Sequence, residues 1–418
     1  MVSLSRLLLA TCLLTCSPCL RSQSFDLTQP QPLYSEGQGY GYDICAAPQK
    51  NSQTPFYFSV RVPDGNYRVR VTLGSRRRAS QTMVRAESRR LMVEEVKLKK
   101  GATATITFLV NKRSPRINDG QSVALKPREH TYLNWDDRLT LEFNGSAPAV
   151  QHITVERDTV APTVFLCGNS TVVDQESEPY ASWGQMVPRW FGDRVCIANY
   201  GESGLTAGTF LGQRRLDKVL AELKPGDYVF CEFGHNDQKE HRAGDGAWYH
   251  FAHNLKIFID RVREAGGRIL FLTPTQRRSF DDSRQHIKET HLDYPDAMRA
   301  VAKREGVPVI ELHDMTRTFF ETLGFEGSKR SLVHYPAGTY PGQDKPLADN
   351  THFNPYGAYE VAKMVVAGIQ QLDASFADVL QRAVSEDFMG YDPAHPDDPD
   401  SFQWPSAIIT DTTKPDGN

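Results

Sequence analysis

The run Thr163-Val164-Phe165-Leu166-Cys167 is rich in β-branched and aromatic residues and stops abruptly at Gly168-Asn169-Ser170-Thr171. A short apolar run that a turn residue ends is typical of a buried strand in a parallel sheet. Because helical signals follow, we expect Ser170 in the loop at the carboxyl end of that strand. Ligands bind at this edge of open α/β sheets, and a small nucleophile on a tight turn there is well placed for attack. Taken alone, however, the four residues favour an ordinary turn.

The second half of the chain alternates strand-like and helical patterns. Further strand-like runs occupy residues 194–198, 228–233, 268–273 and 307–312. In one of the helical patterns between them, apolar side chains recur at i, i+3, i+4 and i+7: Leu216, Val219, Leu220 and Leu223. Strands that alternate with amphipathic helices imply right-handed βαβ units and a parallel sheet with helices on both faces. We therefore predict a doubly wound α/β domain at residues 159–374.

The first half is strand-like without helical periods. Residues 56–62 and 67–73 alternate at period two across Pro63-Asp64-Gly65-Asn66, which indicates a hairpin. Similar runs follow at residues 91–98, 103–110, 138–144 and 150–156. Many short strands at this spacing predict an antiparallel β-sandwich at residues 25–158, which either binds sugar or packs as one wall of the neighbouring site. The run Arg76-Arg77-Arg78 is either a solvated loop tip or a contact for an acidic polymer.

Composition and the N-terminus narrow the class of protein. Among 418 residues, Lys and Arg number 48 and Asp and Glu 51, so nothing suggests nucleic acid as a partner. Arg6 precedes an apolar stretch and then small and polar residues, which predicts a signal peptide at residues 1–24 and export, with no membrane span. Lipoprotein cleavage before Cys12 or Cys16 is a second option. The cysteines that remain, whose pairing the sequence leaves open, are Cys45, Cys167, Cys196 and Cys231.

Three later stretches supply polar groups to the edge that carries Ser170. Gly204 follows the second strand, and Gly234-His235-Asn236-Asp237 follows the third. Asp349-Asn350-Thr351-His352 stands just before Asn354-Pro355, the expected start of the last helix. Acyl transfer needs a nucleophile, a base, a group that orients the base, and donors for the oxyanion. Each stretch alone fits a turn or a loop histidine, but the four in this order predict such a site.

This constellation resembles the SGNH (GDSL-like) hydrolase superfamily, and its first and last blocks are similar to those of rhamnogalacturonan acetylesterases. The similarity covers residues 164–372, and the sandwich resembles the galactose-binding-like domain that precedes some bacterial members. The resemblance implies a flavodoxin-like three-layer α/β/α fold with Ser170 as nucleophile, His352 as base and Asp349 as its orienter. The oxyanion hole would be the backbone N–H groups of Ser170 and Gly204 and the side-chain amide of Asn236. Asn169 stands where the family usually has aspartate, so we expect altered local hydrogen bonding and retained catalysis.

The resemblance also suggests the reaction and the substrate. We expect a two-step deacetylation that needs no metal or other cofactor. A galacturonate-containing polymer is anionic, and so cationic side chains are expected at the site. The candidate substrate-binding residues are Arg277, Arg278, His235, His334 and, as a surface for stacking a sugar ring, Trp183.

The last segment and two other functions complete the predictions. Residues 375–418 are rich in proline and aspartate toward their end, which predicts an extended tail on the surface of the catalytic domain. The leading function is an esterase that deacetylates rhamnogalacturonan. The alternatives are a GDSL-type esterase or lipase for other acyl esters or other acetylated glycans such as xylan, and a glycan-binding protein with an inactive hydrolase domain. The sequence does not define the oligomeric state.

Overall fold

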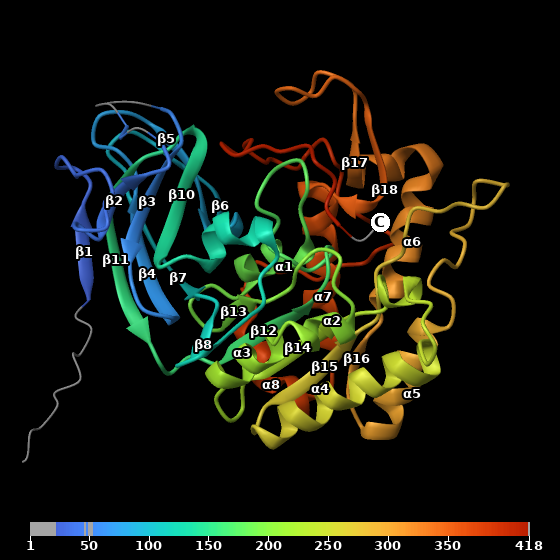
Figure 1. Cartoon of the computed structure of the whole chain (residues 1–418). Helices are drawn as coiled ribbons and strands as arrows, with labels where there is room; N and C mark the ends of the chain where they lie inside the picture. Colours follow the sequence, from blue (N-terminus) through green and yellow to red (C-terminus); the bar gives the residue numbers. More distant parts are fainter. Residues whose placement is uncertain (1–21, 46, 49–52, 417–418) are drawn as a thin grey trace, which may run out of the picture.

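The protein, a computed structural model that describes residues 22–45, 47–48 and 53–416, consists of antiparallel sheets followed by a parallel sheet with helices (Figure 1). The expected signal peptide lies outside the described residues as far as residue 21, and so do Cys12, Cys16 and Cys19. Gln23 and Ser24, which the expected leader includes, pair with Val155 and Thr154. The predicted leader therefore overlaps the first strand by two residues, and its cleavage position stays a prediction.

The N-terminal half is a pair of antiparallel sheets packed face to face. One has the order β1-β11-β4-β7 and the other β2-β3-β10-β5-β6. A single apolar core contains side chains from both sheets, among them Val69 and Ile153 from the first and Phe58 and Leu141 from the second. The strands are β1 (Gln23–Asp26), β2 (Tyr40–Asp43), β3 (Phe56–Arg61), β4 (Gly65–Leu73), β5 (Ser80–Ala86), β6 (Arg90–Leu98), β7 (Ala104–Lys112), β10 (Arg138–Ala147) and β11 (Val150–Asp158).

The predicted hairpin between residues 56–62 and 67–73 is wrong. β3 pairs with β2 and β10, whereas β4 pairs with β11 and β7, so the chain crosses from one sheet to the other between them. At the crossing, the Asp64 carboxylate accepts hydrogen bonds from Lys112 Nζ at 3.0 Å and Lys218 Nζ at 2.8 Å. Period-two alternation shows which face of a strand is buried, but both sheets bury a face in the same core, and the pattern cannot distinguish their partners.

The second half contains a parallel sheet of order β13-β12-β14-β15-β16. In chain order this is 2-1-3-4-5, the flavodoxin-like arrangement, and the predicted fold class is confirmed. The fifth strand is much shorter than residues 307–312, because the next helix already begins at Leu312. The strands are β12 (Thr163–Gly168), β13 (Cys196–Asn199), β14 (Tyr228–Glu232), β15 (Arg268–Leu272) and β16 (Val309–Ile310).

Helices cover both faces of this sheet, as alternation along β12 shows. Leu166 belongs to an apolar layer that includes Trp183 of α1 and Val365 of α7. Its neighbour Phe165 points to the other face and belongs to a layer with Phe258 of α4 and side chains of α2, α3 and α5. The helices are α1 (Trp183–Met186), α2 (Ala207–Gly212), α3 (Arg215–Glu222), α4 (Ala252–Glu264), α5 (Tyr294–Glu305), α6 (Leu312–Gly327), α7 (Pro355–Gln371) and α8 (Ala374–Ala383).

Short elements connect these layers. Two small antiparallel pairs are β8 (Arg116–Asn118) with β9 (Gln121–Ser122) and β17 (Leu332–Tyr335) with β18 (Leu347–Phe353). The 3-10 helices are η1 (Pro127–Thr131), η2 (Leu133–Trp135), η3 (Val187–Trp190), η4 (Asp237–Lys239) and η6 (Ser328–Ser331), and η5 (Ala247–Phe251) is a π-helical turn. Among the described residues, none of the helices combines the length and the apolar character that crossing a bilayer requires.

The C-terminal segment differs in part from the extended tail that was predicted from residue 375. It begins with α8, whose apolar face buries Ala377, Leu380 and Ala383 and whose N-cap is Asp373. Beyond this helix, Phe402 packs against Tyr356 and Tyr359 of α7. The predicted domain limits remain predictions, but β11 ends at Asp158, five residues before β12 begins.

Candidate active site

The last predicted block brings its histidine to the serine. Ser170 lies just after β12, and His352 lies in β18, where a loop was expected. His352 Nε2 is 3.0 Å from Ser170 Oγ, and His352 Nδ1 is 2.8 Å from Asp349 Oδ2. All three residues are buried. The structure therefore joins Ser170, His352 and Asp349 in one chain of hydrogen bonds, and their roles as nucleophile, base and orienter stay predictions.

The charge of Asp349 decides which nitrogen of His352 carries the hydrogen. Burial acts to raise the pKa of Asp349, but the hydrogen bond and charge of His352 and the backbone N–H groups of His352 and Thr351 outweigh it and hold the pKa at about 2. An ionised carboxylate only accepts hydrogen bonds, and so His352 Nδ1 must donate. In the neutral ring, Nε2 then presents its lone pair to the Ser170 hydroxyl, which is the arrangement a general base needs.

Asn169, the departure from the family pattern, shapes the turn after β12. Its Oδ1 accepts from the backbone N of Thr171 at 3.0 Å and lies 2.9 Å from Thr171 Oγ1. Thr171 Oγ1 also lies 2.8 Å from Oε1 of Glu232, whose pKa burial raises to about 7. Within the described part of the chain, Asn169 Nδ2 has no hydrogen-bond partner. The asparagine thus holds the turn through its carbonyl oxygen, and retained catalysis stays a prediction.

The two other oxyanion candidates are tied to the nucleophile loop by a short series of hydrogen bonds. Gln175 Nε2 donates to the carbonyl of Ser170 at 3.0 Å and to Ser203 Oγ at 3.4 Å. Gly204 follows in a left-handed conformation with φ of 79°, which glycine adopts without strain. Asn236 Nδ2 donates to the carbonyl of Leu205 at 3.1 Å, which uses one of its two hydrogens. The structure therefore gathers Ser170, Gly204 and Asn236 at one edge of the sheet.

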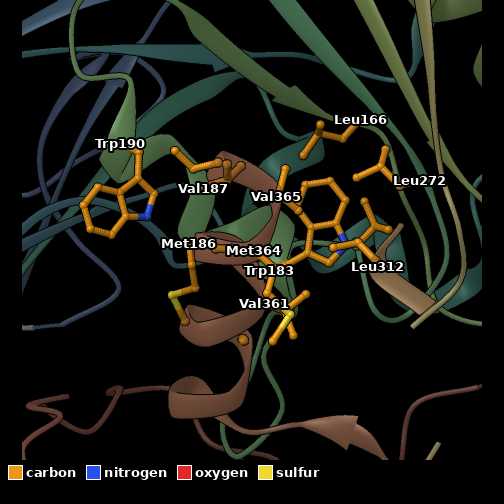
Figure 2. Packing of buried hydrophobic residues seen from close by; sticks show 14 of the residues in the cluster. Leu166, Trp183, Met186, Val187, Trp190, Leu272, Leu312, Val361, Met364 and Val365 are labelled. Atoms are coloured by element: carbon orange, nitrogen blue, oxygen red, sulfur yellow. The ribbon is translucent and has the colours of Figure 1, made fainter. Parts of the chain in front are cut away.

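Trp183 was predicted to stack a sugar ring, and this prediction is wrong. The side chain is 1% exposed and lies in the core with Leu166, Leu272, Leu312 and Val365 (Figure 2). Its Nε1 donates to Glu232 Oε2 at 2.5 Å. The indole therefore satisfies a buried carboxyl beneath the nucleophile loop and has no face open to a ligand.

His235 and Arg278 are also unavailable to a substrate. His235 is fully buried, with Nδ1 3.1 Å from His291 Nε2, so its predicted contact with substrate is wrong. Arg278 is buried as well, and it donates to Ser328 Oγ at 2.9 Å, to Asn350 Oδ1 at 3.0 Å and to the carbonyl of Phe325. Its guanidinium holds the segment next to Asp349, so its predicted role in binding substrate is wrong too.

Arg277 and His334 keep some exposure, and their roles stay predictions. Arg277 Nη2 donates to the carbonyl of His235 at 2.8 Å, and its Nη1 donates to Thr290. His334 Nε2 lies 3.0 Å from Asn350 Oδ1. Both side chains therefore support segments that carry predicted site residues, whether or not they also contact a substrate.

Several residues near the site were not singled out from the sequence. Tyr180 packs edge-on against the ring of His352, at 5.7 Å between ring centres. Lys239 Nζ donates to Asn236 Oδ1 at 3.1 Å, and burial together with Arg277 and Lys414 lowers its pKa to about 8. Lys239 stands two residues after the block Gly234-His235-Asn236-Asp237, but nothing in the sequence places Tyr180 beside the histidine.

Among the residues that the structure describes, two groups of side chains have the composition of a metal site. Glu289, His291 and His313 form one, and Glu240, Asp245 and His250 the other; within each group the potential ligand atoms lie within 4.8 Å of one another. In the first group, His313 Nε2 lies 2.6 Å from Glu289 Oε2. The serine, histidine and aspartate already supply the groups for acyl transfer, and independence from metal and cofactor remains a prediction.

A buried Ser-His-Asp set at the carboxyl edge of a 2-1-3-4-5 parallel sheet defines a serine hydrolase of the SGNH type. Residues 166–359 match the GDSL-like Lipase/Acylhydrolase family. The chain is 39% identical over 219 residues to rhamnogalacturonan acetylesterase RhgT of Bacillus subtilis (strain 168), which covers 52% of this chain and 93% of that protein. This chain belongs to the GDSL-like Lipase/Acylhydrolase family.

Two further comparisons extend into the N-terminal half. The chain is 26% identical over 361 residues to the uncharacterized esterase YxiM of Bacillus subtilis (strain 168), which covers 81% of this chain and 85% of that protein. The crystal structure of YxiM is similar with a TM-score of 0.47 at 22% identity and covers 84% of this chain and 98% of that one. The similarity to RhgT, in contrast, covers only about half of the chain.

Proposed function

We propose that this protein is a carbohydrate esterase that removes acetyl groups from rhamnogalacturonan, a pectic polysaccharide. The observation that carries the chemistry is the single imidazole of His352, placed between Ser170 Oγ and the Asp349 carboxylate. The substrate is supported by similarity to RhgT and to the probable rhamnogalacturonan acetylesterase YesY of Bacillus subtilis (strain 168), at 39% and 29% identity. A polysaccharide substrate also agrees with the proposed export of the chain.

The reaction proceeds in two steps. Ser170 Oγ attacks the acetyl carbonyl carbon while His352 Nε2 takes the hydroxyl proton, and Asp349 stabilises the imidazolium. The backbone N–H groups of Ser170 and Gly204 and the amide of Asn236 receive the oxyanion. The tetrahedral intermediate then expels the sugar oxygen, which takes the proton from His352, and an acetyl-serine remains. Water attacks this ester with His352 again as base, which releases acetate and restores the serine.

Acetate release from three acetylated polymers tests the proposal. Rhamnogalacturonan, homogalacturonan and xylan are compared, with Ser170→Ala as the inactive control. Release from rhamnogalacturonan that the variant abolishes supports both the mechanism and the substrate. Release from xylan alone, or faster cleavage of long acyl chains in a series of 4-nitrophenyl esters, assigns the enzyme to the broader group of esterases. If the polymers and the simple esters both remain intact, the chain is not an active esterase.

A further inference from the structure

The C-terminal segment passes over the edge of the sheet that carries the triad. Asp411 N donates to the carbonyl of Glu178 at 2.8 Å, and Glu178 forms a parallel bridge with Thr410. Lys414 Nζ then lies 3.7 Å from Asp349 Oδ2. In Figure 1 the red segment of the chain accordingly passes beside β18. Residues 410–416 therefore lie beside the proposed catalytic groups.

At the end of this segment, the carboxylate of Asp416 is held by two cations from the stretch between β9 and β10. Asp416 Oδ2 lies 3.0 Å from Lys126 Nζ and 2.8 Å from Arg128 Nη1. Lys126 is the N-cap of η1 and Arg128 lies within it. Both also donate to the carbonyl of Ser203, the residue before Gly204. The carboxylate thus binds where the stretch between β9 and β10 meets Gly204.

Gly204 itself faces Asp416. A Cβ atom added to Gly204 would lie 2.7 Å from Asp416 Cβ and 3.2 Å from Lys126 Nζ, which is closer than van der Waals contact permits. The lack of a side chain at this position therefore leaves room for the residue that presents the carboxylate. A group bound by Lys126 and Arg128 rests directly on the backbone that would stabilise the oxyanion.

The two cations are held in place independently of the tail. Arg128 pairs with the buried Glu202 carboxylate, and Lys126 is fixed by its bond to Ser203. Without the tail, the positive charges of Lys126 and Arg128 face the single negative charge of Glu202. A second carboxylate, here that of Asp416, neutralises the remaining positive charge. An arginine and a lysine that converge on one oxygen form a suitable site for a carboxylate ligand. The side chain of Arg128 is 33% exposed and that of Lys126 is 20% exposed, so a ligand reaches both once Asp416 leaves.

We propose that Lys126 and Arg128 form a carboxylate subsite beside the oxyanion hole, which binds a uronate residue of the acetylated polymer, and that Asp416 occupies it as an internal competitor. The inference rests on the proposed function, because a pectic substrate carries galacturonate carboxylates. The segment between β9 and β10, which belongs to the N-terminal half, thereby contributes specificity to the catalytic half. The tail must withdraw before an anionic chain engages the subsite.

Competition between two sugars that differ in one carboxylate tests this proposal. Galacturonate and galactose are compared as inhibitors of 4-nitrophenyl acetate hydrolysis, with wild type, Lys126→Met and Asp416→Asn. Lys126→Met is chosen because, apart from its ion pair with Asp416, the Lys126 side chain donates to a backbone carbonyl, that of Ser203. Arg128→Met is avoided because it would leave the buried Glu202 carboxylate without its cation. We expect galacturonate inhibition to weaken about tenfold in Lys126→Met and to strengthen about tenfold in Asp416→Asn, since a charge-assisted contact is lost or freed. Galactose inhibition should not change.

A matched ion pair elsewhere on the tail provides the control. Arg330 pairs with Asp400, also an aspartate of the C-terminal segment, at an exposed position. Arg330→Met and Asp400→Asn should leave the inhibition by galacturonate as in wild type. Equal effects on galacturonate and galactose, or galacturonate constants that no variant changes, would overturn the subsite. If the wild-type protein does not hydrolyse the ester, the proposed esterase function is refuted instead. The subsite is then tested separately by measuring galacturonate binding to the same variants by calorimetry.

Discussion

Asp349→Asn should inactivate the enzyme by reversing the direction of one hydrogen bond. Asp349 Oδ1 accepts from the backbone N of Thr351 at 2.8 Å and of His352 at 3.0 Å. These two donors require an oxygen, so the NH2 group of asparagine must take the position of Oδ2, 2.8 Å from His352 Nδ1. Nδ1 then has to accept, and Nε2 carries its hydrogen toward Ser170 Oγ. A base in this tautomer cannot take the serine proton.

The expected loss in kcat is about 10⁴-fold, which corresponds to about 5 kcal/mol of activation free energy. The assay is 4-nitrophenyl acetate hydrolysis, with circular dichroism to show that the fold is retained. Asp392→Asn is a matched control: Asp392 Oδ2 lies 2.8 Å from His395 Nδ1 at the same spacing, but on the surface. It should retain wild-type kcat. An Asp349→Asn enzyme with more than about a tenth of wild-type kcat would refute the tautomer argument.

Three further changes test the site and its support. Asn236→Ala should lower kcat about 10²–10³-fold with little change in KM, and near-full turnover would remove this amide from the oxyanion hole. Trp183→Phe should cost about 2–3 kcal/mol in urea unfolding, because Glu232 loses a buried donor, whereas a raised KM at unchanged stability would instead restore the stacking role. Burial raises the pKa values of Glu232 and Asp237 to about 7, so the native state binds more protons than the unfolded chain between about pH 4 and 7. The free energy of unfolding should therefore fall from pH 5 to pH 8, and Glu232→Gln should make this fall smaller. A free energy of unfolding that rises over this range would contradict the raised pKa values of Glu232 and Asp237.

The parallel sheet and the triad could be predicted because their signals are local. β12 and β14 are buried on both faces, so their residues form continuous apolar runs that differ from the alternating strands before them. Parallel strands end at one edge, and blocks that follow successive strands must meet there. Ser170 and His352 are far apart in sequence, and the topology of the sheet together with the resemblance to the SGNH superfamily predicts their contact.

The substrate-binding predictions failed for Trp183, His235 and Arg278 for a shared physical reason. Each residue stands beside a motif, and proximity in sequence does not reveal the direction of a side chain. Trp183 points inward because the buried Glu232 requires a donor, and Arg278 because carbonyl and amide oxygens near Asn350 surround its guanidinium. The same limit hid Lys126 and Arg128, which reach Asp416 only through tertiary structure.

The sandwich helps to build the site, which bears on whether it binds sugar or packs as a wall. Arg90, at the start of β6, pairs with Asp174 at 2.6 Å, and both side chains are buried. Its neighbour Arg89 donates to the carbonyls of Gln175 at 3.1 Å and Tyr180 at 2.9 Å.

Gln175 in turn holds the carbonyl of Ser170, so a turn of the sandwich supports the loop that carries the nucleophile. This turn is buried against the catalytic half and offers no surface to a sugar. If the buried guanidinium groups of Arg89 and Arg90 lost their partners, their charges would be left unpaired, which would lower the free energy of unfolding by about 3–5 kcal/mol. The two halves are therefore coupled through the nucleophile loop, and any sugar that the sandwich binds must bind at another of its faces.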